Sequence, residues 1–378
     1  MISTVFWVVE RHQGAAAHAL LKEKGWLHPD IEVLHLGEAS IGFPLNLEDD
    51  AIPGTIVDTL SGDGRLEEHM VMVKTPVDPH RRLAAQVAAW MDQHAQEATT
   101  WGLTEHLPTR WERLGDLVLL PHETMAQTGW MEARRHPHAT MLWERMAEAL
   151  KVSSLGVQGP IADDTFRSSQ VEMLLGTSEV VLRDHGITYT FDAAKVMFSS
   201  GNITERRRIG GLRLDGETVV DAYAGVGYYA LPMLVHGNVA HLHACEINPA
   251  SIEGLRKAAA INGVEERLTI HEGDNSDALM TLEGLADRCH LGLLPSSEPV
   301  WESCFLALKP SGGTLHIHMN VEEEHIETWV ANTLERFRGI AKKHGRKVDI
   351  IADHLEKVKW FAPFVRHVVL DLRIHQVR

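Results

Sequence analysis

The chain has 378 residues and 44% hydrophobic content, which suits a globular protein of two or three domains. Its net charge of −16 excludes a uniformly basic surface for nucleic acid, although a local basic patch suffices for such binding. Cys245, Cys289 and Cys304 have neither metal-binding nor C-x-x-C spacing, so a reducing, cytoplasmic location is expected. No signal sequence and no apolar run of membrane-spanning length is recognised, so no membrane contact is expected.

The first half of the chain mixes strand and helix signals around a proline-rich segment, Pro76-Val77-Asp78-Pro79, which predicts a linker. The expected elements are a strand at 5–10, a helix at 15–24, a turn at 62–64, an amphipathic helix at 80–97, and strands at 117–120 and 180–191. We therefore expect an N-terminal α/β module over 1–75, a middle α+β domain over 76–200 and a third domain over 201–378.

A glycine turn begins the third domain. The apolar run at 218–220 leads into Asp221, and Gly225 and Gly227 follow just before helical sequence. Glycine allows the backbone to approach a ligand where a Cβ would clash, so this strand-to-helix turn is typical of nucleotide-like ligands. An ordinary buried strand that ends in a glycine turn is the alternative.

Two further strand ends support the ligand hypothesis. The run at 240–244 ends at Glu246, which is placed to accept ribose hydroxyls, and a helix is expected from Pro249 to Ile261 with Asn248 as its N-cap. The run at 268–271 leads to Asp274 and Asn275, an acid and an amide suited to adenine. The three strand ends predict an S-adenosylmethionine site. NAD proteins share the first two features, but the sequence shows no second mononucleotide half.

The alternation continues to the end of the chain. Strands are expected at 288–294, 313–319, 348–352 and 365–374, and helices at 299–308 and 321–344. The last two strands have no helix between them, which predicts an antiparallel edge. The fold class expected is therefore α/β, with a Rossmann-like, class I methyltransferase-type sheet at the C-terminus and smaller α+β N-terminal and middle domains.

Basic residues gather late in the chain, where 331–378 holds 11 Lys and Arg against 5 Asp and Glu. Lys342 and Lys343 belong to a cluster after the long helix, and further cations flank Trp360-Phe361, an aromatic pair able to stack on an exposed base. A solvated helix end is the alternative for the lysine cluster. A second basic run is Arg206-Arg207-Arg208.

Histidines alternate along two expected strands, at His241 and His243 and at His316 and His318. Such pairs share a strand face and could bind zinc. Because neither pair has a third ligand at suitable spacing, we expect no metal.

Several segments resemble one enzyme family, the tRNA wybutosine-synthesizing aminocarboxypropyl transferases, which are sisters of the tRNA guanosine-37 N1-methyltransferases. The resemblance covers roughly residues 80 to 375. It rests on the segments 191–206, 221–232, 243–249, 292–298 and 315–322, with weaker matches at 107–116, 361–363 and 367–372.

The resemblance implies a reaction. The 3-amino-3-carboxypropyl group of S-adenosylmethionine would pass to carbon 7 of 4-demethylwyosine, a tricyclic base at position 37 of phenylalanine tRNA, and methylthioadenosine would be released. The implied partner is the anticodon arm of that tRNA, and a monomer is expected. The first 75 residues would contact tRNA only by analogy.

The resemblance also implies residue roles. Ser199 would contact the amino-acid end of the cofactor, and Arg206 would be a basic cofactor contact. The loop that includes Pro295 and Ser296 would face the substrate, and Glu298 is a candidate for deprotonating the acceptor carbon, or else an ordinary acid at a helix N-terminus.

Two other functions are considered. Methyl transfer to guanosine-37 would use the same fold and cofactor, but the sister enzymes carry Asn-Leu-Pro where this chain has Leu293-Leu294-Pro295 followed by Ser-Ser-Glu. A non-catalytic tRNA- or protein-binding module is disfavoured because Gly225, Gly227 and the strand-end acids are intact.

Overall fold

The computed structural model describes residues 2–28, 31–37, 39–46, 64–71, 78–94, 101–159, 169–198 and 200–377. Contacts divide the chain into two units, Met1–Arg82 and Leu83–Arg378. The first unit carries one antiparallel sheet in the order β2-β3-β1-β4, with α1 packed on it. Its elements are β1 (Ile2–Glu10), α1 (Gly14–Lys24), β2 (Leu34–Leu36), β3 (Ser40–Pro44) and β4 (Gly64–Val71).

Helices and a small mixed sheet form the first part of the second unit, and three buried tryptophans, Trp90, Trp130 and Trp143, fill their core. The sheet order is β5-β6-β7-β8. The elements are α3 (Pro79–His94), β5 (Glu112–Leu114), β6 (Leu117–Leu120), α4 (His122–Met125), α5 (Thr128–Arg135), α6 (Ala139–Leu150), β7 (Ser154–Val157) and β8 (Glu172–Leu175).

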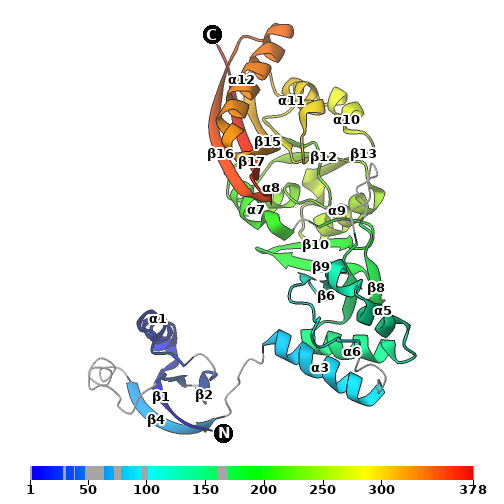
Figure 1. The fold of residues 1–378 in the computed structure, drawn as a ribbon. Helices are drawn as coiled ribbons and strands as arrows, with labels where there is room; N and C mark the ends of the chain where they lie inside the picture. Colours follow the sequence, from blue (N-terminus) through cyan, green and yellow to red (C-terminus); the bar gives the residue numbers. More distant parts are fainter. Residues whose placement is uncertain are drawn as a thin grey trace. The chain divides into compact units, whose positions relative to one another are not determined.

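A seven-stranded sheet forms the rest of the unit, in the order β13-β12-β11-β14-β15-β17-β16 (Figure 1). The first five strands are parallel to one another, β17 runs antiparallel to β15, and β16 runs antiparallel to β17. The strands are β11 (Thr218–Asp221), β12 (His241–Glu246), β13 (Leu268–Glu272), β14 (Arg288–Leu291), β15 (Gly312–Glu322), β16 (Val348–Ala362) and β17 (Val365–Gln376).

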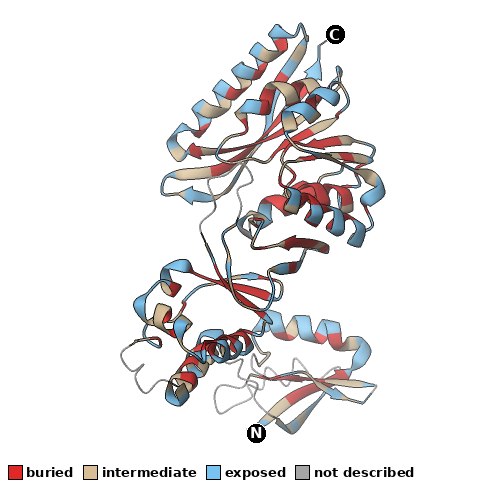
Figure 2. Ribbon diagram, turned by 90° about the vertical axis from the view of Figure 1, so that its right-hand side faces the viewer, coloured by how far each residue is buried: buried red, intermediate tan, exposed pale blue. Residues whose placement is uncertain are grey.

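Helices cover both faces of this sheet, so that most of its strands are buried (Figure 2). One face packs against α7 (Ile203–Gly210), α8 (Ala230–Val235) and α9 (Pro249–Ile261). The other face packs against α10 (Asn275–Thr281), α11 (Trp301–Ala307) and α12 (Ile326–Lys343). This arrangement confirms the predicted α/β class and its antiparallel edge.

Three elements differ from the prediction. The strand expected at 180–191 is a hairpin of β9 (Glu179–Asp184) and β10 (Ile187–Asp192), whose turn holds His185 with φ of +50°. Strand β16 runs ten residues beyond the expected end at 352. The helix expected from 321 begins at Ile326, after β15 and a short 3-10 turn. Ile350 is the only buried residue of β16, because this strand lies at the sheet edge, so no long apolar or alternating pattern marks its length in the sequence.

The domain boundaries expected at 75 and 200 stay predictions. The β9–β10 hairpin packs on α9, where Thr190 Oγ1 donates to the Gly254 carbonyl at 3.0 Å and Asn262 Nδ2 donates to the Thr188 carbonyl at 2.7 Å. Residues 62–63 of the expected turn and residues 76–77 of the expected linker lie outside the described residues, and Pro79 already begins α3.

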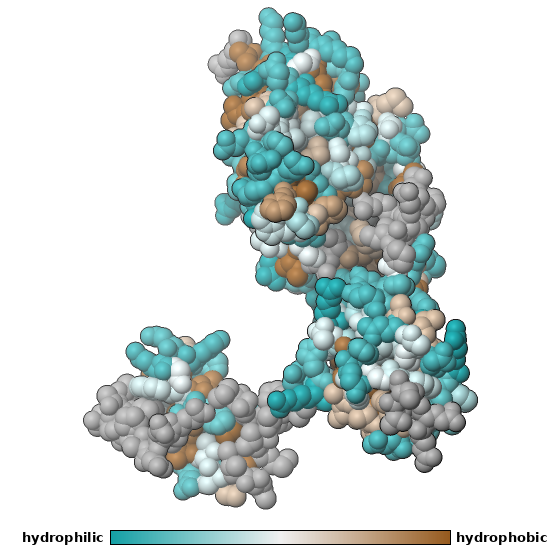
Figure 3. Space-filling view, in the orientation of Figure 1, coloured by the Kyte–Doolittle hydropathy of each residue, from teal (hydrophilic) through white to brown (hydrophobic). Residues whose placement is uncertain are grey.

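No helix in the described part of the chain is long and apolar enough to cross a membrane. On the face shown in Figure 3, hydrophilic residues predominate in the seven-stranded part and hydrophobic residues form small separate patches.

Candidate cofactor and substrate site

A cavity of about 350 Å³ lies at the carboxyl ends of the parallel strands, and we call it the cofactor cavity. It receives residues from the ends of β11, β12, β13 and β14, and from the segment that precedes α7. Its lining residues are Val196, Met197, Ala222, Tyr223, Tyr228, Cys245, Glu246, Ile247, Asn248, Ser251, Gly273, Asp274, Asn275, Gly292 and Leu293. The structure therefore brings Glu246, Asp274 and Asn275 together, as expected for strand ends on one edge of a sheet.

The turn after β11 requires its glycines. Gly225 and Gly227 have φ values of +55° and +92°, which side-chain-bearing residues rarely adopt. A Cβ at Gly227 would also lie 2.7 Å from Leu231 Cγ and 2.8 Å from Leu255 Cδ1. The turn is therefore packed directly against α8 and α9.

Glu246 joins this turn to the second strand. Its Oε2 accepts the Gly225 N–H at 2.7 Å, and its Oε1 accepts the N–H groups of Asn248 at 2.8 Å and Ile247 at 3.1 Å. Burial raises the pKa of Glu246, while these backbone donors oppose the rise. A carboxylate has about four acceptor positions, so one remains for a ribose hydroxyl.

The third strand end is fixed in a similar way. Asp274 caps α10 by accepting the Ser276 N–H at 2.8 Å, and that hydrogen bond lowers the Asp274 pKa. Asn275 Nδ2 donates to the Ala222 carbonyl at 2.9 Å, which ties the third strand end to the first. The edge that would hold an adenosine is therefore built before any ligand arrives.

Asp221 is fully buried at the end of β11. Its Oδ1 accepts the Tyr223 N–H at 3.3 Å, whereas its Oδ2 has no hydrogen-bond partner in the described structure. His290 Nδ1 lies 3.6 Å from Asp221 Oδ1, and Asp221 itself does not line the cofactor cavity, whereas the next residue, Ala222, does.

The remaining predicted cofactor residues are placed differently. Ser199 lies outside the described residues. Arg206 is buried on α7, where its Nη2 lies 2.8 Å from Asp184 Oδ2, and it does not line the cofactor cavity.

The loop after β14 divides between two cavities. Gly292 and Leu293 line the cofactor cavity, but Pro295, Ser296 and Glu298 line a separate cavity of about 550 Å³ beside α11 and α12. There Glu298 Oε2 accepts a hydrogen bond from Arg336 Nη1 at 3.1 Å.

The predicted lysine pair is far from the strand ends that carry the acids. Lys342 and Lys343 are exposed at the end of α12. The next strand, β16, begins beside the amino ends of the parallel strands, whereas the acids lie at their carboxyl ends. Lys343 Nζ lies 2.6 Å from a carboxylate oxygen of Glu302. The structure does not bring this pair to the cofactor cavity.

The sequence analysis missed a buried polar network on the sheet face under α7 and α8. His318 Nδ1 lies 2.9 Å from His367 Nε2, and His318 Nε2 lies 3.0 Å from His290 Nε2. His316 Nδ1 lies 2.6 Å from Asp371 Oδ1. Burial lowers the pKa of His316 and of His367 to about 4, so both rings are neutral at pH 7.

Helix α7 closes this network with charged groups. Arg208 Nη1 donates to Asp371 Oδ2 at 2.7 Å, and Arg208 Nη2 donates to Glu205 Oε1 at 2.8 Å. The alternating histidines at 316 and 318 were a visible signal, but their partners lie on β14 and β17, which only the register of the sheet reveals. The pair His241 and His243 instead contacts Thr269 and His271 of β13.

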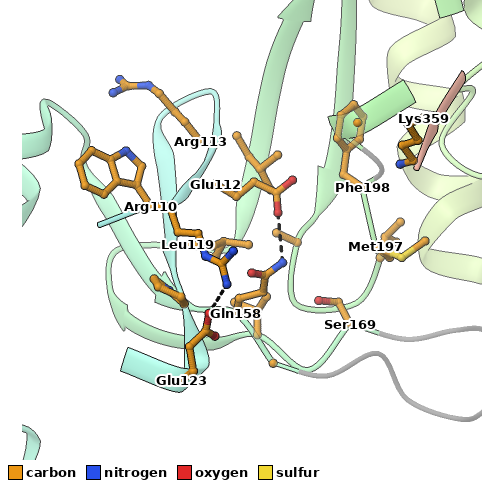
Figure 4. Close-up of a pocket in the computed structure, with 18 residues that line it drawn as sticks. Arg110, Glu112, Arg113, Leu119, Glu123, Gln158, Ser169, Met197, Phe198 and Lys359 are labelled. Atoms are coloured by element: carbon orange, nitrogen blue, oxygen red, sulfur yellow. Dashed lines mark hydrogen bonds and ion pairs between the residues drawn. The ribbon is translucent and has the colours of Figure 1, made fainter. Parts of the chain in front are cut away.

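A second cavity, of about 690 Å³, adjoins the first, and we call it the outer cavity. Val196 and Met197 line both cavities. Figure 4 shows Met197 and Lys359 on one side of the outer cavity and Arg110, Glu112 and Gln158 across from them. The outer cavity thus lies between the small mixed sheet and the seven-stranded sheet.

The strand order, the glycine turn and the acids at successive strand ends together define a class I methyltransferase-like domain. Comparison with known proteins agrees with this class. The TRM5/TYW2 methyltransferase domain matches residues 180–351, and the TYW2 N-terminal domain matches residues 91–179.

Curated relatives include several tRNA wybutosine-synthesizing proteins. A "tRNA wybutosine-synthesizing protein 2 homolog" of Danio rerio is 39% identical over an alignment of 302 positions, and the match covers 71% of this chain and 72% of the relative. The human homolog is 35% identical and covers 78% of this chain and 75% of its own length. The Arabidopsis thaliana "tRNA wybutosine-synthesizing protein 2/3/4" is 40% identical over 72% of this chain, but the match spans only 27% of that longer protein. The chain belongs to the tRNA wybutosine-synthesizing protein 2 family.

Solved structures show the same fold. The structure of P. horikoshii TYW2 in complex with MeSAdo is 30% identical, with a TM-score of 0.62, and covers 78% of this chain and all of that one. Trm5b from Pyrococcus abyssi, at 22% identity and a TM-score of 0.60, covers 98% of this chain and shares the fold.

Proposed function

We propose that this chain transfers the 3-amino-3-carboxypropyl group of S-adenosylmethionine to carbon 7 of 4-demethylwyosine at position 37 of phenylalanine tRNA, with release of methylthioadenosine. The observation that carries this proposal is the match of residues 91–179 to the TYW2 N-terminal domain, next to a methyltransferase domain shared with TRM5. The family membership and the cofactor cavity support it.

The cofactor cavity suits this co-substrate. Glu246 would accept a ribose hydroxyl, and Asp274 and Asn275 would contact the adenine, since all three line the cavity. Asp221 is not part of that lining, but its Oδ2 has no hydrogen-bond partner in the described structure and would accept the ammonium of the amino-acid end. When bound, S-adenosylmethionine supplies an electrophilic carbon next to a sulfonium leaving group. The protein's contribution is orientation, because the same sulfonium carries three carbon substituents and only one must face the acceptor.

The outer cavity would receive the acceptor base. It shares Val196 and Met197 with the cofactor cavity, and Trp111 among its lining residues offers an aromatic face for stacking. Glu298 lies in the separate cavity beside α12, so this proposal gives it no part in proton transfer.

The partner proposed is the anticodon arm of phenylalanine tRNA, bound by a monomer in the cytoplasm. The tip of the β16–β17 hairpin supports an RNA contact, because Trp360, Phe361 and Phe364 are each at least half exposed there. The three cysteines are buried and free, as expected in a reducing compartment.

The test is to incubate the protein with S-adenosylmethionine and tRNA that carries the tricyclic precursor, and to identify both products by mass spectrometry. Methylthioadenosine together with tRNA that gains an aminocarboxypropyl mass is the expected result. S-adenosylhomocysteine together with methylated guanosine-37 would instead establish the sister activity. Cofactor binding without turnover on a panel of tRNAs would favour a binding module.

A further inference from the structure

Lys359 presents a cation to the outer cavity. It lies on β16, opposite His367 of β17, and is half-buried among the lining residues of that cavity. Its amine points to the side occupied by Met197 and Phe198 (Figure 4). Because Met197 also lines the cofactor cavity, Lys359 stands close to the passage between the two ligand sites.

Lys359 differs from the other cations of its hairpin. Lys357 Nζ and Arg366 Nε each lie 2.8 Å from a carboxylate oxygen of Glu323. No carboxylate in the described ranges forms an ion pair with Lys359, and burial together with the charge of Arg206 lowers its pKa. A half-buried ammonium without a counterion is unfavourable, and an anionic ligand would relieve that cost.

Space for the amine comes from Gly201. A Cβ at this position would lie 2.8 Å from Lys359 Nζ, so any larger residue would push the amine away. Gly201 belongs to the short 3-10 turn Ser200–Asn202 that leads into α7, immediately after the segment that lines both cavities. The Lys359 amine thus lies beside the Gly201 backbone, and both residues line the outer cavity.

We propose that Lys359 binds the carboxylate of the 3-amino-3-carboxypropyl group and holds it on the acceptor side of the cofactor cavity. This inference rests on the proposed function. In that reaction the group that is transferred carries a carboxylate, whereas in methyl transfer the group that is transferred carries no charge. No covalent bond to Lys359 forms. The lysine orients the group so that the carbon next to the sulfonium faces the outer cavity.

The test compares two ligands that differ only by the carboxylate. Calorimetry measures the Kd of S-adenosylmethionine and of decarboxylated S-adenosylmethionine for the unchanged protein, Lys359→Met and Lys359→Arg. Lys359→Met should weaken S-adenosylmethionine binding about tenfold or more and change binding of the decarboxylated ligand less than about twofold. Lys359→Arg should retain most of the affinity.

Two further variants sharpen the result. Gly201→Ala leaves the lysine in place but displaces its amine, so it should reproduce the ligand-selective loss. Lys357→Met removes a neighbouring cation that already has a partner in Glu323, and it should affect neither ligand. Equal weakening of both ligands by Lys359→Met, or no weakening of S-adenosylmethionine binding, would overturn the proposal.

Failure of the proposed function would look different. If the unchanged protein releases S-adenosylhomocysteine while Lys359→Met still loses carboxylate selectivity, the binding role stands and the transfer of the larger group fails. If methylthioadenosine is released but Lys359→Met weakens only tRNA binding, the lysine contacts a phosphate, and the carboxylate role is wrong.

Discussion

His318 Nε2 lies 3.0 Å from His290 Nε2 in the middle of the buried polar face of the seven-stranded sheet. Since His318 also meets His367 through its other nitrogen, at 2.9 Å, three imidazoles form one continuous chain across β14, β15 and β17. Neutral rings can form such a chain, because each offers one donor and one acceptor, whereas charged rings would repel one another. This chain of contacts is therefore suited to neutral imidazole rings.

Stability should fall in mild acid. His316 and His367 have pKa values of about 4 in the folded protein because of burial, against about 6.5 in an unfolded chain. Below pH 6.5 the unfolded chain binds protons that the folded protein does not. Each ring should therefore lower the free energy of unfolding by about 1.4 kcal/mol per pH unit as the pH falls from 6.5 towards 4. Urea unfolding at pH 7.5, 6.0 and 5.0 measures the slope, and a flat profile would contradict the prediction.

Asp371→Asn should destabilise the protein by about 3–5 kcal/mol, because it removes the buried carboxylate charge that Arg208 and His316 contact and leaves Arg208 with Glu205 as its only ion-pair partner in the described structure. Burial alone would raise the pKa of Asp371, but His316 and Arg208 lower it well below its usual range, which shows how strongly the carboxylate is held in its charged form. Asp353→Asn removes a carboxylate from a more exposed pair with Arg373 and should cost less than about 1 kcal/mol. Urea unfolding of both variants at pH 7.5 makes the comparison, and equal losses would refute the special role of Asp371.

Glu246→Gln should weaken S-adenosylmethionine binding by about 1.5–3 kcal/mol, because an amide cannot accept all three backbone N–H groups that the carboxylate now accepts. Glu272→Gln is the matched control, since Glu272 ends the neighbouring strand but pairs with Arg256 outside the cavity. Calorimetry at one pH compares the two, and unchanged affinity in Glu246→Gln would remove this residue from the site.

Replacing both Trp360 and Phe361 by Ala should weaken tRNA binding by about 1–3 kcal/mol if they stack on bases, without changing cofactor affinity. Changing both Lys342 and Lys343 to Glu, at the end of α12, tests the tRNA contact that the sequence predicted there. Filter binding at two salt concentrations separates the contributions, because phosphate contacts weaken with salt. A larger loss from the lysine pair would place the tRNA along α12 instead.

The sequence predicted the sheet, its antiparallel edge and the strand-end acids because each depends on local signals. Asn248, for example, accepts the Ala250 N–H at 2.9 Å and starts α9 with Pro249, as its place in the sequence indicates. Relationships across strands were not predictable in this way. The placement of Glu298 beside Arg336 depends on how α12 packs over α11, and no nearby residue signals it.

The late position of Asp371 in the chain has a consequence for synthesis on the ribosome. Arg208 and Asp371 are 163 residues apart, so α7 emerges long before the strand that neutralises it. Until β17 is made, the nascent protein holds a helix whose arginine and glutamate have only each other and water as partners. The charged contacts of α7 are therefore completed only after the strand that carries Asp371 has been synthesised.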